Sequence, residues 1–163
     1  MRRQRGFTMV ELIMVMVMVG VLAAIGIPRL MGGNTTGAMV FGDQVASALR
    51  HAQSSAVSHR RVVCLDLGAR TVVMRIRTAT AAPTEAGMNA CPSPLQGVDN
   101  GMYDSSDSTV ALTGTPIQLY FQPDGTISGA PAGAPLGAVR LGITLDGTPQ
   151  RTIVLEGSTG YVE

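Results

Sequence analysis

The sequence predicts an α+β protein in which a long apolar N-terminal helix precedes a head of one amphipathic helix and antiparallel β-strands. Residues 7–27 contain one strongly polar side chain, Glu11, and a helix of that length crosses a hydrocarbon core of roughly 30 Å. Apolar residues at helical spacing follow in residues 38–58. Short β-rich runs bounded by turn residues occupy much of the remaining chain. These three observations define the expected order of elements.

The apolar segment is too long for a strand, and both its odd- and even-numbered positions are apolar, so we expect a helix. Arg2, Arg3 and Arg5 precede it, and the positive-inside rule therefore places the N-terminus in the cytoplasm and the head outside. An ordinary secretory signal is the alternative, because small residues around Ala23 and Ala24 imitate a cleavage site. The apolar core is longer than such signals usually carry.

Glu11 needs a partner, because a carboxylate costs about 2.5–3.5 kcal/mol at the centre of a membrane helix and less near the interface. If the chain is cut after Gly6, the new amine of Phe7 lies one helical turn from Glu11. In an assembly, the amine of a neighbouring chain could pair with it instead.

The run Gly6-Phe7-Thr8-Met9-Val10-Glu11-Leu12 resembles the class III leader junction of type IV prepilins and type II secretion pseudopilins. In that superfamily a membrane-embedded prepilin peptidase cuts after the Gly and N-methylates the new Phe, and the fifth-position Glu guides docking into a helical filament. The resemblance implies cleavage between Gly6 and Phe7, methylation of Phe7, and a filament-assembly role for Glu11.

The same resemblance divides the chain into a removed leader at 1–6, a transmembrane assembly helix at 7–28 and a periplasmic globular head at 29–163. It places the protein in the bacterial inner membrane as a single-pass chain, and in a filament or at the cell surface after assembly. The implied partners are other minor and major pilins or pseudopilins, the prepilin peptidase and an inner-membrane assembly platform. Pro28 lies where such proteins often carry a kink, and the end of the span is the alternative reading.

In the head, the Gly- and Thr-rich residues 29–37 have a composition that is poor for a rigid helix. An amphipathic helix is expected from about Ala38 to Ser58, and its apolar face is formed by Phe41, Val45, Leu49, Ala52 and Ala56. Runs 61–67 and 71–77 predict a β-hairpin, and runs 116–122, 138–145 and 151–156 predict further strands, each followed by turn residues. Residues 78–107 are rich in Ala, Pro, Ser and Gly, which predicts an exposed variable loop.

The head also resembles the GspH/FimT-type branch of pseudopilins and minor pilins, through residues 49–56, 121–125, 153–155 and 160–162. The resemblance implies a pilin-like fold whose helix packs on two β-sheets or on one strongly bent sheet. Members of this branch are low-abundance subunits, thought to lie at or near the filament tip and to prime assembly. It also implies a type IV pilus or a type II secretion system, and does not separate the two.

Cys64 and Cys91 fall in the part expected outside the cytoplasm, where disulfides persist. A Cys64–Cys91 bridge and a reduced, buried Cys64 in an apolar strand are both consistent with the sequence.

We expect no metal or cofactor. His51 and His59 lie eight residues apart without a Cys or carboxylate at ligand spacing, and they are expected to be solvated residues at a helix end. A small group of oxygen-bearing loop residues could bind calcium, although its spacing fits no EF-hand. Its members are Asp99, Asn100, Asp104 and Asp107.

Net charge gives little reason to expect a nucleic-acid protein. Without the three leader arginines, nine basic side chains face eleven acidic ones. Five arginines could still gather into a patch suited to phosphate backbones: Arg50, Arg60, Arg61, Arg75 and Arg77. Some FimT-type relatives bind DNA during natural transformation, but their basic residues extend toward the C-terminus, whereas this chain ends with Glu156 and Glu163. No catalytic motif is present, so we expect no enzymatic activity.

Overall fold

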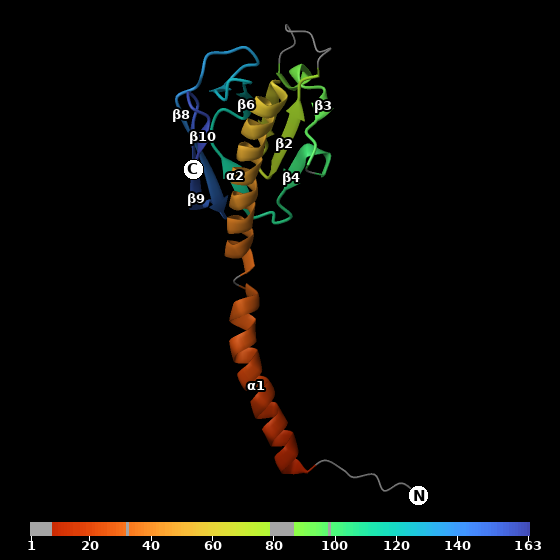
Figure 1. Ribbon diagram of the computed structural model, residues 1–163. Coiled ribbons are helices and arrows are strands. Elements are labelled where there is room, and N and C mark those ends of the chain that lie inside the picture. The colour runs from red at the N-terminus through yellow and green to blue at the C-terminus, as the bar shows by residue number, and fades with distance from the viewer. Residues whose placement is uncertain (1–7, 32, 79–86, 98) are drawn as a thin grey trace, which may run out of the picture. The chain divides into compact units, whose positions relative to one another are not determined.

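The computed structural model describes residues 8–31, 33–78, 87–97 and 99–163 (Figure 1). These residues form two compact units, with the boundary between Gly33 and Asn34. The first unit holds the apolar helix and the second is the head.

The first unit consists of α1 (Met9–Met31). From Met9 to Ile27 it is long and apolar enough to cross a membrane, and no other described helix is. Its large apolar side chains from Met9 to Ile27 are 51–81% exposed. The helix continues past Pro28 to Met31, while the stretch apolar enough to span a membrane ends at Ile27, in keeping with the alternative that Pro28 marks the end of the span. The kink at Pro28 stays a prediction.

The head begins with α2 (Gly33–His59). The second helix was expected from about Ala38, but helical backbone reaches Met31 and resumes at Gly33. Gly and Thr each weaken a helix by about 1 kcal/mol or less relative to Ala. Ala38 and Phe41 are buried and anchor this end of α2 in the core.

The strands form two antiparallel sheets. The first has the order β3-β2-β1-β6-β7, with β4 also paired to β2; its strands are β1 (Val63–Leu67), β2 (Thr71–Ile76), β3 (Ser93–Pro94), β4 (Met102–Asp104), β6 (Gln118–Phe121) and β7 (Ile127–Ser128). The second has the order β10-β9-β8-β5; its strands are β5 (Val110–Thr113), β8 (Ala138–Leu145), β9 (Thr148–Glu156) and β10 (Tyr161–Val162). The predicted hairpin β1–β2 is confirmed, and the runs predicted as strands at 138–145 and 151–156 form β8 and β9, which pair antiparallel.

The main core lies between α2 and both sheets (Figure 1). The helix face predicted from spacing is confirmed, since every residue of that face is buried: Phe41, Val45, Leu49, Ala52 and Ala56. Leu65 and Leu119 contribute from the first sheet, and Ile143 and Ile153 from the second. The head is therefore a helix packed on two β-sheets.

The prediction of an exposed loop over 78–107 is wrong for the described residues 87–97 and 99–107. This stretch contains the short 3₁₀ helices η1 (Gly87–Ala90) and η2 (Asp99–Gly101), and it supplies β3 and β4. Both strands pair with β2, through Ser93↔Ile76 and Tyr103↔Val72. The exposed edge of β2 offers unpaired backbone groups, and strands of two or three residues satisfy them without showing a sequence alternation.

Candidate functional site

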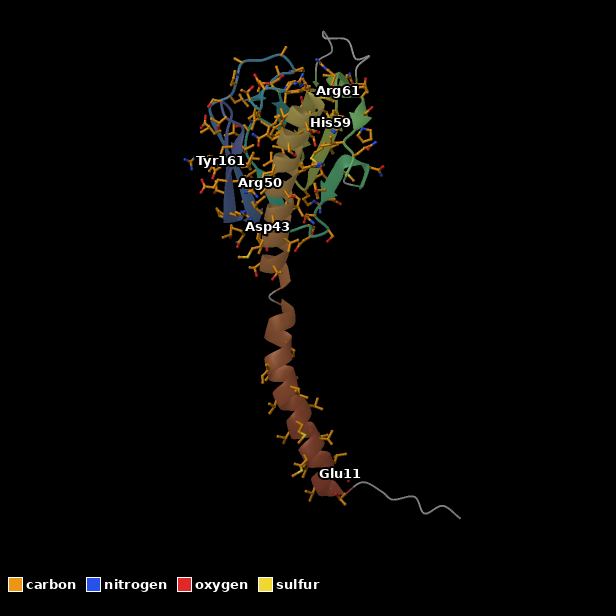
Figure 2. The ribbon with its side chains drawn as sticks, in the orientation of Figure 1. Glu11, Asp43, Arg50, His59, Arg61 and Tyr161 are labelled. Carbon is orange, nitrogen blue, oxygen red and sulfur yellow. A yellow bond between two sulfur atoms is a disulfide. The ribbon has the colours of Figure 1, made fainter. Side chains whose placement is uncertain are left out.

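The N-terminal site lies at the first turn of α1. Gly6 and Phe7, the expected cleavage and methylation positions, lie outside the described residues. Glu11 is exposed in the first helical turn (Figure 2), and its backbone N–H donates to Thr8 Oγ1 at 3.2 Å. Thr8 thus acts as the N-cap, and Glu11 occupies the third helical position of a Thr-x-x-Glu capping pattern. This role of Thr8 was not predicted, although the Thr-x-x-Glu pattern in the sequence indicates it.

A disulfide joins Cys64 to Cys91 on the face of the first sheet that turns away from α2. The two Cα atoms are 6.0 Å apart, and both residues are fully buried. Val62, Ala90 and Tyr120 complete a second apolar cluster around the bridge. The disulfide therefore fastens the 87–95 segment across that face.

Arg75 and Arg77, predicted for a basic patch, bind backbone carbonyls of this segment. Arg75 Nε donates to the Cys91 carbonyl at 2.7 Å, and its Nη2 donates to the Pro92 carbonyl. Arg77 Nε donates to the Ala90 carbonyl at 3.2 Å. These contacts give the two guanidinium groups a structural role beside the disulfide.

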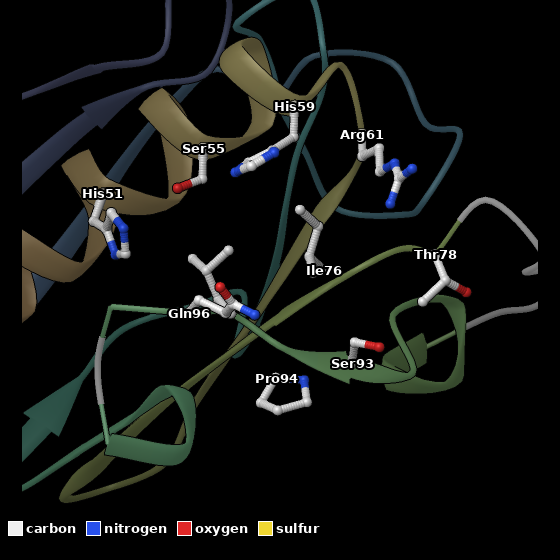
Figure 3. Close-up of a pocket in the computed structure, with 10 residues that line it drawn as sticks. His51, Ser55, His59, Arg61, Ile76, Thr78, Ser93, Pro94 and Gln96 are labelled. Atoms are coloured by element: carbon white, nitrogen blue, oxygen red, sulfur yellow. The ribbon is translucent and has the colours of Figure 1, made fainter.

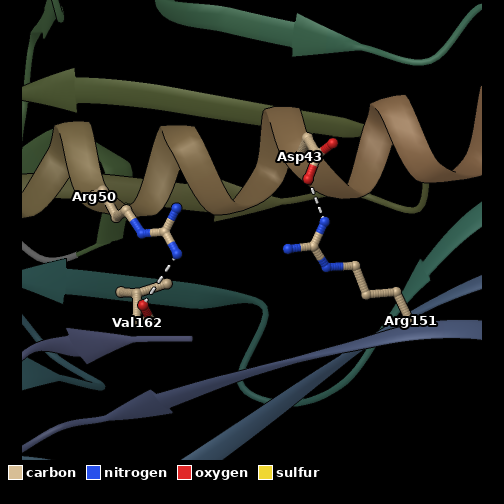
Figure 4. A network of polar contacts seen from close by, with 4 residues as sticks. All are labelled: Asp43, Arg50, Arg151 and Val162. Carbon is tan, nitrogen blue, oxygen red and sulfur yellow. Dashed lines mark hydrogen bonds and ion pairs between the residues drawn. The ribbon is translucent and has the colours of Figure 1, made fainter.

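Arg50, the third arginine of the predicted patch, connects α2 to the second sheet. Its Nη2 donates to the Val162 carbonyl at 3.3 Å, and Asp43 forms an ion pair with Arg151 (Figure 4). The two contacts hold the polar flank of α2 against β9 and β10. The Asp43–Arg151 pair was missed by sequence analysis, because nothing in either residue's neighbourhood marks a partner 108 residues away.

Arg60 and Arg61 follow the last turn of α2 and are exposed. Arg60 adopts the left-handed conformation, with φ of 51°. The N–H of Arg61 donates to the Ala56 carbonyl at 3.1 Å, and the N–H of Arg60 donates to the Val57 carbonyl at 3.3 Å. This is a Schellman cap with arginine where glycine is usual. The chain reverses here, and Arg61 but not Arg60 reaches the pocket described next.

A pocket of about 300 Å³ lies between the C-terminal half of α2 and the 93–96 segment (Figure 3). His51, Ser55 and His59 line it from successive turns of one helix face. Arg61, which follows the helix, lines one end of the pocket. The remaining lining residues are Ile76, Thr78, Ser93, Pro94, Leu95 and Gln96. The prediction that both histidines are solvated holds for His59, which is exposed, while His51 is half-buried.

Of the four loop residues that could bind calcium, Asp107 has hydrogen-bond partners within its own turn. Asp107 Oδ1 accepts hydrogen bonds from Thr109 Oγ1 at 2.6 Å and from Thr109 N at 2.9 Å, and these bonds lower the pKa of Asp107. Asp104 is exposed on β4, and Asn100 adopts a φ of 51° within η2. Among the described residues, no three His, Cys, Asp or Glu side chains lie close enough to share a metal.

An apolar N-terminal helix together with a helix on two antiparallel sheets defines the pilin-like class. The prokaryotic N-terminal methylation motif matches residues 1–27. Two crystal structures of the type IV minor pilin FimU from Pseudomonas aeruginosa are similar to this chain at 17% identity, with TM-scores of 0.53 and 0.52. The first match covers 82% of this chain and 88% of FimU, and the second 77% and 90%. A comparison with curated proteins found no match.

At 17% identity, the similarity to the FimU structures shows the fold alone. The leader motif is an independent sequence feature. Together they give this chain an N-terminal methylation motif and a type IV pilin-like fold.

Proposed function

We propose that the protein is a minor pilin or pseudopilin, a structural subunit that enters a type IV pilus or a type II secretion pseudopilus. Prepilin peptidase cuts between Gly6 and Phe7 and methylates the new amine of Phe7. The observation that carries the proposal is the N-terminal methylation motif over residues 1–27. The minor pilin-like head supports a low-abundance subunit at or near the filament tip.

The exposed apolar surface of α1 supports assembly through this helix. Its large apolar side chains are at least half exposed, and burying each of them is worth about 1.5–3 kcal/mol relative to water. The inner membrane would cover this surface before assembly, with the head in the periplasm. Neighbouring pilin or pseudopilin helices would cover it in the filament, after transfer by the inner-membrane assembly platform.

Glu11 is the residue we propose for docking. Its carboxylate lies at the N-terminal end of α1, where the helix dipole favours a negative charge, and it is exposed. The amine of Phe7, from the same chain or from a neighbour, would neutralise it in the membrane. Such a pair removes the cost of a lone carboxylate and aligns one subunit axially against the next.

The test compares Glu11→Val with Met14→Leu, a matched apolar exchange one turn further along α1. We expect both variants to be cut after Gly6, because neither change touches the scissile bond. Glu11→Val should reach the sheared filament fraction at least tenfold less than the wild type, while Met14→Leu should reach it normally. Incorporation of Glu11→Val at the wild-type level would refute the docking role.

Deleting the gene in the native host separates the two filament systems. Loss of surface filaments with normal export of secreted proteins would assign the subunit to a type IV pilus. Loss of export with intact filaments would assign it to type II secretion. Normal filaments and normal export together would contradict both assignments.

DNA binding is the second candidate function, and exposed Arg60 and Arg61 at the end of α2 favour it. Arg75 and Arg77 are less suited to it, because they bind the carbonyls beside the disulfide. A gel shift with the detergent-solubilised chain tests the idea. A shift that survives Arg60→Gln combined with Arg61→Gln would show that these residues do not carry it.

A further inference from the structure

The pocket between α2 and the 93–96 segment combines hydrogen-bond donors with an apolar floor, and it lies outside the N-terminal assembly site. Arg61 supplies a planar guanidinium, and His51 and His59 supply two imidazoles (Figure 3). Hydroxyl groups come from Ser55 and Ser93. The described lining residues include no Asp or Glu, so an anionic guest meets no opposing carboxylate there.

The apolar floor of the pocket favours an anion that carries a hydrocarbon group. Ile76, Pro94 and Leu95 line it, and Leu95 is buried. A bare inorganic ion would leave this apolar surface in contact with water. A carboxylate on a short hydrocarbon stem would place its charge against Arg61 and its methylenes against Ile76 and Pro94.

The walls of the pocket are held in place independently of any guest. The Schellman cap at the end of α2 positions Arg61. On the opposite side, the disulfide and Arg75 fix the chain immediately before Ser93. Gly97 has φ of +97°, and a Cβ at this position would lie 3.2 Å from His51 Cε1, so glycine lets the segment close onto the helix. A preformed pocket loses little binding free energy to the ordering of its side chains and backbone.

We propose that this pocket binds a carboxylate carried on an apolar stem, supplied by an acidic side chain or a C-terminal residue of another polypeptide. Arg61 would donate two hydrogen bonds to the carboxylate, the histidines and Ser93 would supply further donors, and Ile76 and Pro94 would contact the stem. The inference stands whether or not the subunit enters a filament, because it uses only residues of the head.

Two-dimensional amide NMR of the full chain in dodecyl maltoside micelles tests the chemistry with three small probes. Butyrate, with six non-hydrogen atoms, should shift the amides of Ser93 and Gln96 with a Kd on the order of 1–10 mM. Butyramide, its uncharged analogue, and sulfate, a bare anion, should bind at least fivefold more weakly. Equal binding of butyramide would overturn the charge requirement, and equal binding of sulfate would overturn the requirement for a stem.

Arg61→Gln and Arg60→Gln form a matched pair of neighbouring exposed arginines, of which only Arg61 lines the pocket. Arg61→Gln should weaken butyrate binding about tenfold, in keeping with loss of a charge-assisted bond. The butyrate affinity of Arg61→Lys should lie between those of the wild type and Arg61→Gln. Arg60→Gln should bind butyrate like the wild type. Equal losses in Arg60→Gln and Arg61→Gln would assign the effect to a general basic surface and overturn the pocket.

An acetylated and amidated pentapeptide with one central glutamate tests the source of the carboxylate. It should shift the same amides at a lower concentration than butyrate, and its glutamine counterpart should not. If this peptide and a glutamine counterpart with a free C-terminal carboxylate both bind more weakly than butyrate, the pocket takes a free carboxylic acid and the polypeptide partner is overturned. A single-stranded oligonucleotide that shifts these amides more strongly than the peptide would overturn the choice of a carboxylate.

Discussion

The Cys64–Cys91 disulfide closes a loop whose ends are 27 residues apart, and its removal should destabilise the head by a calculable amount. The loop-entropy relation gives about 3.5 kcal/mol at 25 °C for a loop of this length. Both sulfurs are buried in the cluster that includes Tyr120, so Cys64→Ala combined with Cys91→Ala also removes a little packing. We therefore expect a loss of about 3–4 kcal/mol in the free energy of unfolding.

Guanidinium unfolding of the full chain in non-ionic micelles, followed by tyrosine fluorescence, measures this loss. With a slope of about 3–4 kcal/mol/M for a domain of this size, the midpoint should fall by roughly 1 M. Dithiothreitol should lower the wild-type midpoint by a similar amount and leave the double variant unchanged. A double variant within about 1 kcal/mol of the wild type, or a reductant-insensitive wild type, would refute the stabilising role.

Three further predictions concern the head and use the same unfolding transition. Phe41→Ala should cost about 3–5 kcal/mol because Phe41 is buried against both sheets, whereas Met39→Ala, at a position 58% exposed, should change stability by less than about 0.5 kcal/mol. Hydrogen bonds from the backbone N–H and side chain of Thr126 lower the pKa of Asp124 in the folded protein. The contribution of this carboxylate to the free energy of unfolding is therefore present above its unfolded pKa and is lost as the pH falls through its folded pKa. Asp124→Asn should make the free energy of unfolding less dependent on pH below about pH 4. Burial raises the pKa of Tyr120, so the contribution of its neutral phenol to the free energy of unfolding is present below about pH 10 and is lost as the pH rises through the folded pKa. Tyr120→Phe should make the free energy of unfolding less dependent on pH in the alkaline range, and an unchanged dependence would contradict the assignment.

The parts of the fold that could be predicted from sequence are those with strong local signals. The steps from Phe41 to Ala56 match one helix face, and all five residues of that face are buried. The β1–β2 hairpin follows from two β-rich runs around a three-residue turn. The leader is a short motif of fixed spacing, and it is readable without any tertiary contact.

The parts that could not be predicted depend on contacts between distant segments. Strands β3 and β4 are too short to alternate, and they exist because the edge of β2 pairs with them. The pairing of Cys64 with Cys91 requires η1 to cross the first sheet, which no local pattern specifies. The carboxylate pocket likewise combines α2 with residues 93–96, and the sequence presented His51 and His59 only as isolated polar residues.

Intact mass of the membrane-extracted chain tests the proposed processing most directly. Cleavage after Gly6 and methylation of the new amine predict a chain that begins at Phe7 and carries one added methyl group. A chain that still begins at Met1, isolated from cells with active prepilin peptidase, would contradict the proposed processing and assembly.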